Sequence, residues 1–274
     1  ALVRTPEGVT ALGGTGRSAA APLDAYASDG GSSVTVPGIV DGWVTAQRRF
    51  GRMPLAEALA PAREIAERGY RVDADLRGAV RQQSERISRY GSDRWELLGL
   101  AEGESWVQPE LAGLLDAIGA EGGSAFYEGQ AAAAIGRAVQ QHGGAITTAD
   151  LSAHRTIESA PVATSWGELT LAVQPPPTQG VLLAMAARWL DRNAGLLTPE
   201  NLEHVLIEAT EAAFAHRDAA ADGDALLEEL LAIDVERAQG RGGPRAYLHT
   251  AGVATADAAG NVVSSLVSVF DDFG

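Results

Sequence analysis

Residues 249–274, HTAGVATADAAGNVVSSLVSVFDDFG, decide the fold of this chain. Two apolar, β-branched runs flank an Asp-x-x-Gly-Asn segment at residues 257–261, and this pattern predicts a β-hairpin. Thr250 lies at the free start of the first predicted strand. A hydroxyl is a weak nucleophile until a base lies beside it, and a chain cut before Thr250 would supply its own α-amine, with a pKa of about 8. The alternative is an ordinary strand threonine that suits a pleated surface.

The composition is that of an acidic globular protein. The chain has 274 residues, is 46% hydrophobic and carries a formal net charge of −15 at pH 7. That charge repels nucleic acid and anionic membranes, so we expect neither as a partner. The sequence has no cysteine, and all 21 basic residues are arginine. Disulfides, thiolate nucleophiles, cysteine-ligated zinc and Schiff-base lysine chemistry are therefore excluded.

The histidines do not form a metal-binding motif. They lie far apart and none belongs to an H-E-x-x-H pair, so we expect surface or packing roles and no metal or other cofactor. The five are His142, His154, His204, His216 and His249. No apolar run approaches the roughly 20 residues that a membrane helix needs, and residues 1–8 do not resemble a signal peptide. The sequence leaves the compartment open.

Helical periodicity dominates the middle of the chain. Apolar residues recur at intervals of three and four in segments that end near glycine, which predicts amphipathic helices. These segments are residues 40–50, 55–68, 111–121, 129–141 and 181–191, with another helix after the Thr198-Pro199 cap. Residues 73–89 are charged and helical in propensity, which predicts a helix with a solvated face. Two short strands are expected within residues 2–12 and another at 169–173. Strands at both ends with helices between them indicate an α/β or α+β fold.

An ordered series of local motifs resembles the γ-glutamyltranspeptidase family, a branch of the N-terminal nucleophile hydrolases. The matching motifs are Val36-Pro37-Gly38 with Gly42, Phe50-Gly51, Pro61-Ala62 with Ala66, Gly69-Tyr70, Phe126-Tyr127-Glu128-Gly129, Gly143-Gly144 with Thr147, Asp150-Leu151, the Pro-Pro-Pro-x-x-Gly run at 175–180, Glu208-Ala209 with Arg217, and the Thr250 hairpin ending in Phe273-Gly274. The resemblance implies a four-layer αββα sandwich, incomplete at both ends. Residues 1–249 would form the large-subunit-like region and residues 250–274 the start of the small-subunit-like region, within one composite domain.

The resemblance also implies roles for residues of the hairpin. The family's precursor cuts itself before the nucleophile, which here is the bond between His249 and Thr250. Thr250 would then take an acyl group from a γ-glutamyl or similar amide donor and pass it to water or an amine. Ser268 falls where the family usually has a threonine that supports the nucleophile, and on a paired strand it would reach Thr250. The alternative for Ser268 is a polar residue on a half-buried strand.

Substrate-binding residues follow from the same resemblance. Arg17 matches the arginine that clamps the donor's α-carboxylate, a task that suits the planar guanidinium fork; the alternative is a plain surface arginine. Phe270 stands where the family has an asparagine that contacts the substrate, which weakens the case for a glutamyl donor. Ala251 and Gly252 replace a threonine and a histidine, so we expect altered or slower autocleavage.

Three functions are therefore considered. The first is a γ-glutamyltransferase or hydrolase, the second a divergent acylase or C–C hydrolase of specialised metabolism, and the third a non-catalytic relative. The expected partners are a small-molecule substrate and the rest of the small subunit, in further sequence or a companion chain. That region holds the family's oxyanion-hole donors, and losing one such donor costs about 10²- to 10³-fold in rate. Oligomeric state is left open, a homo-oligomer included.

Overall fold

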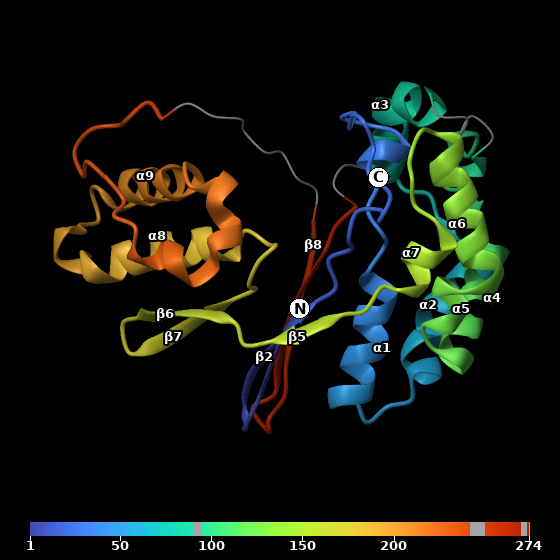
Figure 1. The fold of residues 1–274 in the computed structure, drawn as a ribbon, viewed down its shortest axis with the longest axis horizontal. Helices are drawn as coiled ribbons and strands as arrows, with labels where there is room; N and C mark the ends of the chain where they lie inside the picture. The colour runs from blue at the N-terminus through green and yellow to red at the C-terminus, as the bar shows by residue number, and fades with distance from the viewer. Residues whose placement is uncertain (90–94, 242–249, 270–272, 274) are drawn as a thin grey trace. The chain divides into compact units, whose positions relative to one another are not determined.

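A computed structural model describes residues 1–89, 95–241, 250–269 and 273 (Figure 1). The chain divides into two compact units, which are described separately below. Unit 1 consists of Ala1–Gly13 and Ile157–Ser268, and unit 2 of Gly14–Thr156 and Val269–Gly274.

Unit 1 contains a five-stranded antiparallel sheet in the order β5-β2-β1-β9-β8. Its strands are β1 (Leu2–Thr5), β2 (Gly8–Gly13), β5 (Ile157–Ser159), β8 (Ala251–Ala256) and β9 (Val262–Val267). Segments from near the two ends of the chain lie side by side here, since β1 pairs with β9 (Figure 1). The predicted hairpin is confirmed by the β8–β9 pairing. Its turn is closed by Asp257, whose Oδ1 accepts hydrogen bonds from the backbone N–H groups of Ala259 and Asn261, both at 2.9 Å.

The rest of unit 1 is a hairpin packed against helices. The elements are β6 (Val162–Trp166), β7 (Leu169–Val173), α8 (Gly180–Arg192), the 3-10 turn Ala194–Leu196, α9 (Leu202–Phe214) and the 3-10 segment Arg217–Glu228. Buried apolar side chains of α8 and α9, among them Val181 and Val205, form one core with β6 and β7. Helix α9 begins three residues later than a Thr198 cap would predict. Thr198 and Asn201 instead exchange side-chain to backbone hydrogen bonds, which closes a separate turn before the helix.

Unit 2 is mainly helical. Its helices are α1 (Ile39–Phe50), α2 (Leu55–Arg68), α3 (Ala74–Arg89), α4 (Pro109–Glu121), α5 (Ser124–Tyr127), α6 (Gly129–Gln141) and α7 (Thr148–Ser152), with 3-10 turns at Gly31–Ser33 and Glu96–Leu98 and a short pair β3 (Tyr70–Arg71) and β4 (Ser105–Trp106). Thr147 and Asp150 form a reciprocal capping box at the start of α7, which satisfies free N–H groups of its first turn. Core residues including Val40, Ile118 and Leu151 pack together beneath these helices.

Within residues 1–89, 95–241, 250–269 and 273, no helix combines the length and the apolar character that a membrane span requires. No group of three or more histidine, aspartate or glutamate side chains in the same residues could hold a metal ion.

Candidate functional site

The open end of the β8–β9 hairpin contains two of the predicted site residues. The last pair of the ladder is Ala251 with Val267. Thr250 and Ser268 are the next residues of the two strands beyond this pair, and both side chains are exposed. Directly opposite residues of an antiparallel pair have Cβ atoms about 4.5–5.5 Å apart. The predicted contact between the two hydroxyls requires the register to continue by this one residue.

Strand β8 forms one edge of the five-stranded sheet. All six of its residues are exposed, and in the sheet order its neighbour is β9. Apolar side chains of the hairpin are exposed too: Val253 is 56% and Leu266 is 73% exposed. An edge strand with exposed apolar residues is able to pair with a further strand. Thr250 directly precedes the first residue of this edge strand.

Two of the predicted site residues lie outside the described residues. They are His249, on the far side of the predicted cleavage bond, and Phe270, the predicted substrate contact. Both assignments stay predictions.

Arg17, the predicted carboxylate clamp, lies in unit 2 on a loop with an exposed side chain. The backbone of this loop packs directly against the backbone at Val36. The carbonyl of Arg17 accepts a 3.0 Å hydrogen bond from the N–H of Val36, and a Cβ atom on Gly16 would overlap the Val36 carbonyl. A Cβ atom on Gly38 would likewise overlap the carbonyl of Gly14. Glycine is therefore required at both positions, and the close approach fixes the backbone that carries Arg17.

Replacing Gly16 with alanine is expected to displace this loop. The added methyl group must push apart two backbone segments, a change that typically costs about 1–3 kcal/mol. We expect roughly a tenfold rise in KM for a carboxylate-bearing donor, because Arg17 moves with the loop. The measurement is KM and kcat, with thermal unfolding recorded for each variant. Gly42→Ala in α1 is the control, since a Cβ atom there meets nothing within 4 Å, and an unchanged KM in Gly16→Ala would contradict the prediction.

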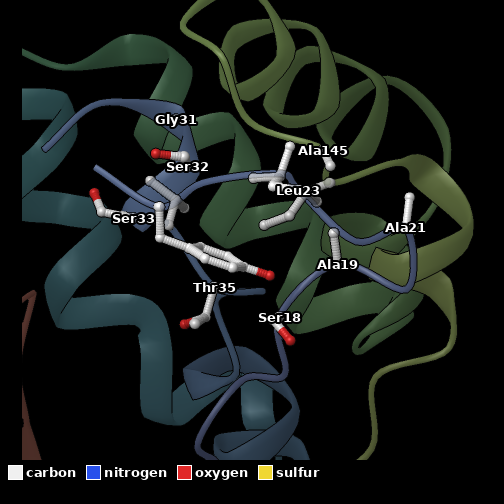
Figure 2. A pocket seen from close by; sticks show the side chains of 12 residues that line it. Ser18, Ala19, Ala21, Leu23, Gly31, Ser32, Ser33, Thr35 and Ala145 are labelled. Atoms are coloured by element: carbon white, nitrogen blue, oxygen red, sulfur yellow. The ribbon is translucent and has the colours of Figure 1, made fainter. Parts of the chain in front are cut away.

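A small pocket adjoins Arg17 in unit 2 (Figure 2). Its lining consists of Ser18, Ala19, Ala21, Leu23, Tyr26, Gly31, Ser32, Ser33, Val34, Thr35, Ala145 and Ile146. Figure 2 shows hydroxyl groups and small apolar side chains along the loop that follows Arg17. None of the lining side chains carries a charge at neutral pH, so the pocket supplies neither a carboxylate ligand nor a general base. Arg17, the residue before Ser18 in the sequence, is not among the lining residues.

A buried polar cluster supports the turn on which this loop rests. His154 is 5% exposed, and its ring stacks on that of Tyr127 with centroids 5.4 Å apart. The Tyr127 hydroxyl donates to the carbonyl of Pro37 at 2.7 Å and accepts from the N–H of Asp41 at 3.1 Å. Asp41 Oδ2 in turn accepts from the N–H of Thr156 at 2.5 Å. The expected packing role of this histidine is confirmed, whereas the role of Tyr127 was not apparent from its motif.

Burial controls the protonation of both rings in this cluster. It raises the pKa of Tyr127 to about 12, so the phenol keeps the proton that it donates to Pro37. Burial also lowers the pKa of His154 below its ordinary value, and the opposing charge of Asp41 does not outweigh it. Among the described residues, His154 Nε2 has no hydrogen-bond partner. A proton added to this ring would therefore place a charge in a buried site.

The stability of the protein is therefore expected to fall in mild acid. Below about pH 6.5 the unfolded chain takes up a proton on His154, but the folded chain resists it until its own lower pKa is reached, so the free energy of unfolding decreases across this window. The slope for one proton is at most about 1.4 kcal/mol per pH unit. The measurement is the free energy of unfolding in urea at a series of pH values from 7.5 to 5. His154→Gln should flatten the profile and the exposed His142→Gln should not; equal profiles for wild type and His154→Gln would refute the assignment.

Comparison with known proteins defines the class to which this fold and these residues belong. A family model described as gamma-glutamyltranspeptidase matches residues 16–274, so the chain belongs to the γ-glutamyltranspeptidase family. The structure resembles that of Helicobacter pylori γ-glutamyltranspeptidase, with a TM-score of 0.72 and 25% identity over 80% of this chain and 69% of that one. The predicted family and the N-terminal nucleophile hydrolase fold are thus confirmed.

Individual relatives include hydrolases and an acylase. The chain is 34% identical over 277 residues to the glutathione hydrolase-like YwrD proenzyme of Bacillus subtilis (strain 168), covering 89% of this chain and 50% of that protein. It is 32% identical over 272 residues to the acylase ACY 1 proenzyme of Pseudomonas sp. (strain V22), covering 89% and 48%. The chain therefore spans about half the length of the curated relatives that it matches.

Proposed function

We propose that this chain is part of an N-terminal threonine hydrolase or acyltransferase that is processed before Thr250. The observation that carries the proposal is the β8–β9 register, whose last pair, Ala251 with Val267, lies directly beside Thr250 and Ser268 at the open end of the hairpin. Strand pairing supplies a fixed position for the nucleophile, and the opposite hydroxyl supplies a hydrogen-bond partner for it. The proenzyme names of the relatives support a processing step.

Processing requires one intramolecular acyl shift followed by hydrolysis. Thr250 Oγ attacks the carbonyl carbon of His249, and its proton passes to the Thr250 nitrogen as the peptide bond breaks. Water then hydrolyses the resulting ester. The products are a carboxylate on His249 and a free α-amine on Thr250, which serves as the base for the second reaction.

Acyl transfer then uses the freed threonine. The α-amine accepts the Oγ proton as Oγ attacks the donor's carbonyl, and the amine of the donor leaves with a proton. Water or an acceptor amine attacks the acyl-enzyme ester and restores Thr250. Ser268 donates a hydrogen bond to Thr250 Oγ, which stabilises negative charge as the proton leaves.

The proposed donor is a γ-glutamyl amide. Arg17 supports this choice, because a guanidinium binds a carboxylate through two parallel hydrogen bonds. The second candidate is an acylase or C–C hydrolase that acts on another acyl compound, and the similarity to the acylase ACY 1 proenzyme favours it. Turnover of a γ-glutamyl anilide compared with that of uncharged acyl anilides separates the two.

A further polypeptide segment is proposed as the partner of the β8 edge. The exposure of all six β8 residues supports this, since a strand added there would cover them. Residues 250–274 would begin the small subunit and residues 1–249 would form the large one. The oxyanion-hole donors would come from the added segment.

The decisive test is the intact mass of the full-length gene product. Cleavage yields two polypeptides, one of which starts at Thr250. A full-length product that stays intact under all conditions, with no acyl transfer, would leave the non-catalytic alternative.

A further inference from the structure

An irregular segment in unit 1, residues 229–241, is tied down although it forms no helix or strand. Leu231 is buried in the core of α8 and α9. His204 Nε2, on α9, lies 3.0 Å from the carbonyl oxygen of Asp234. Asp234 Oδ1 accepts hydrogen bonds from the two N–H groups that follow, at residues 236 and 237. The segment therefore follows a defined path along α9.

A buried ion pair holds the last described residues of this segment. Glu208 on α9 is 2% exposed, and its Oε2 lies 2.5 Å from Arg241 Nη1. Its other oxygen accepts the N–H of Gln239 at 3.0 Å. Arg241 Nη2 donates to the carbonyl of Ala232 at 2.7 Å and to Gln239 Oε1 at 2.9 Å. One carboxylate thus joins two points of the segment to the helix.

The energetics of this pair require a reason beyond stability. A buried ion pair is often no more stabilising than apolar residues of the same size. Burial by itself would raise the pKa of Glu208, but the hydrogen bonds from Gln239 and Arg241 and the charge of Arg241 outweigh it, so the pKa lies below its ordinary value. The carboxylate therefore stays ionised at neutral pH. Such a pair fixes geometry, because both oxygens have directional partners.

The position of the pair in the sequence suggests what it fixes. Arg241 lies eight residues before His249, and the strand pairing of β8 begins at Ala251, directly after Thr250. Both attachment points belong to unit 1. The attack of Thr250 on the preceding carbonyl depends on how the connection between these points approaches the threonine.

We propose that Glu208 and Arg241 form a positioning pair for autocleavage, which holds the start of the connection to the His249–Thr250 bond. This inference rests on the proposed function. Without the pair, the last described attachment before Thr250 is that of Asp234, so the connection from the last described attachment to Thr250 lengthens from 8 to 15 residues. Loop-closure entropy alone would slow cleavage only about 2.5-fold. Loss of orientation at the reacting bond costs more, and displacements of about 1 Å slow reactions up to about 100-fold.

The experiment follows cleavage of the full-length gene product by intact mass over time. Arg241→Met is expected to lower the first-order rate constant of cleavage at least tenfold, and Arg241→Lys to restore part of it. Glu208→Gln combined with Arg241→Met leaves no unpaired buried charge, and it should be equally slow while the unfolding midpoint stays near that of the wild type. The control is Arg188→Met, which removes another ion pair of unit 1, that with Glu228 at 2.9 Å.

The readouts separate positioning from a structural role. Once cleaved, the double variant should transfer acyl groups with the wild-type kcat/KM, because the pair acts only on processing. Wild-type cleavage in the double variant, a loss of threefold or less, or an equal loss in Arg188→Met would overturn the proposal. A wild-type protein that never cleaves would overturn the proposed function itself.

Discussion

Replacing Thr250 with alanine is expected to leave the full-length protein as a single polypeptide and to abolish acyl transfer. The side chain supplies the hydroxyl for both reactions, and its α-amine becomes the base only after the cut. Removing a nucleophile of this kind lowers kcat by roughly 10⁴- to 10⁶-fold. Intact mass reports the cut, and release of p-nitroaniline from a γ-glutamyl anilide reports the transfer.

Three further variants test whether the loss of cleavage and acyl transfer in Thr250→Ala reflects removal of the nucleophile. Thr250→Ser retains the hydroxyl and should still cleave. Thr255→Ala alters an exposed threonine of the same strand, away from the open end, and should behave as wild type. Ser268→Ala should slow both reactions without abolishing them, because it removes a hydrogen bond and not the nucleophile. Cleavage at the same bond in Thr250→Ala would disprove the assignment of the nucleophile.

The parts of the structure that follow from local sequence signals were predicted correctly. The β8–β9 hairpin follows from Asp257, whose carboxylate closes the turn, and from the β-branched runs on either side. Helix α8 follows from apolar residues at helical spacing after three prolines, of which Pro177 is the last. Once the turn is fixed, the register is fixed as well. The pairing of Ala251 with Val267, directly beside Thr250 and Ser268, is therefore also a consequence of local sequence.

The parts that the sequence did not reveal depend on interactions between distant residues. Tyr127 bonds to Pro37, 90 residues earlier, and Glu208 pairs with Arg241, 33 residues later. Taken alone, none of these residues is of an unusual type. A motif match does not identify the distant residue with which each of them interacts. Burial converts these partners into geometric constraints, because an unpaired polar group there costs about 1–3 kcal/mol. Only the folded chain identifies them.

Replacing Arg17 is expected to impair the turnover of a donor that carries an α-carboxylate and to spare a donor that lacks one. Hydrogen bonds to a charged group contribute about 1.5–3 kcal/mol each, so Arg17→Met, which removes both hydrogen-bonding arms of the guanidinium, should lower kcat/KM for a γ-glutamyl anilide about 10²- to 10⁴-fold. A 4-aminobutyryl anilide lacks the α-carboxylate and should be turned over equally by both proteins. Arg17→Lys keeps the charge but not the planar fork, and should lie between them.

The controls for Arg17 separate recognition from folding and from processing. Only fully cleaved protein is compared, so a slower cut cannot lower the measured turnover. Arg52→Met removes another exposed arginine of unit 2 and should leave both donors unaffected. Equal losses on the two donors would indicate a general disturbance of the protein and not the loss of carboxylate recognition. No loss on either donor would remove the carboxylate clamp from the site and favour an acylase that selects its substrate through other residues.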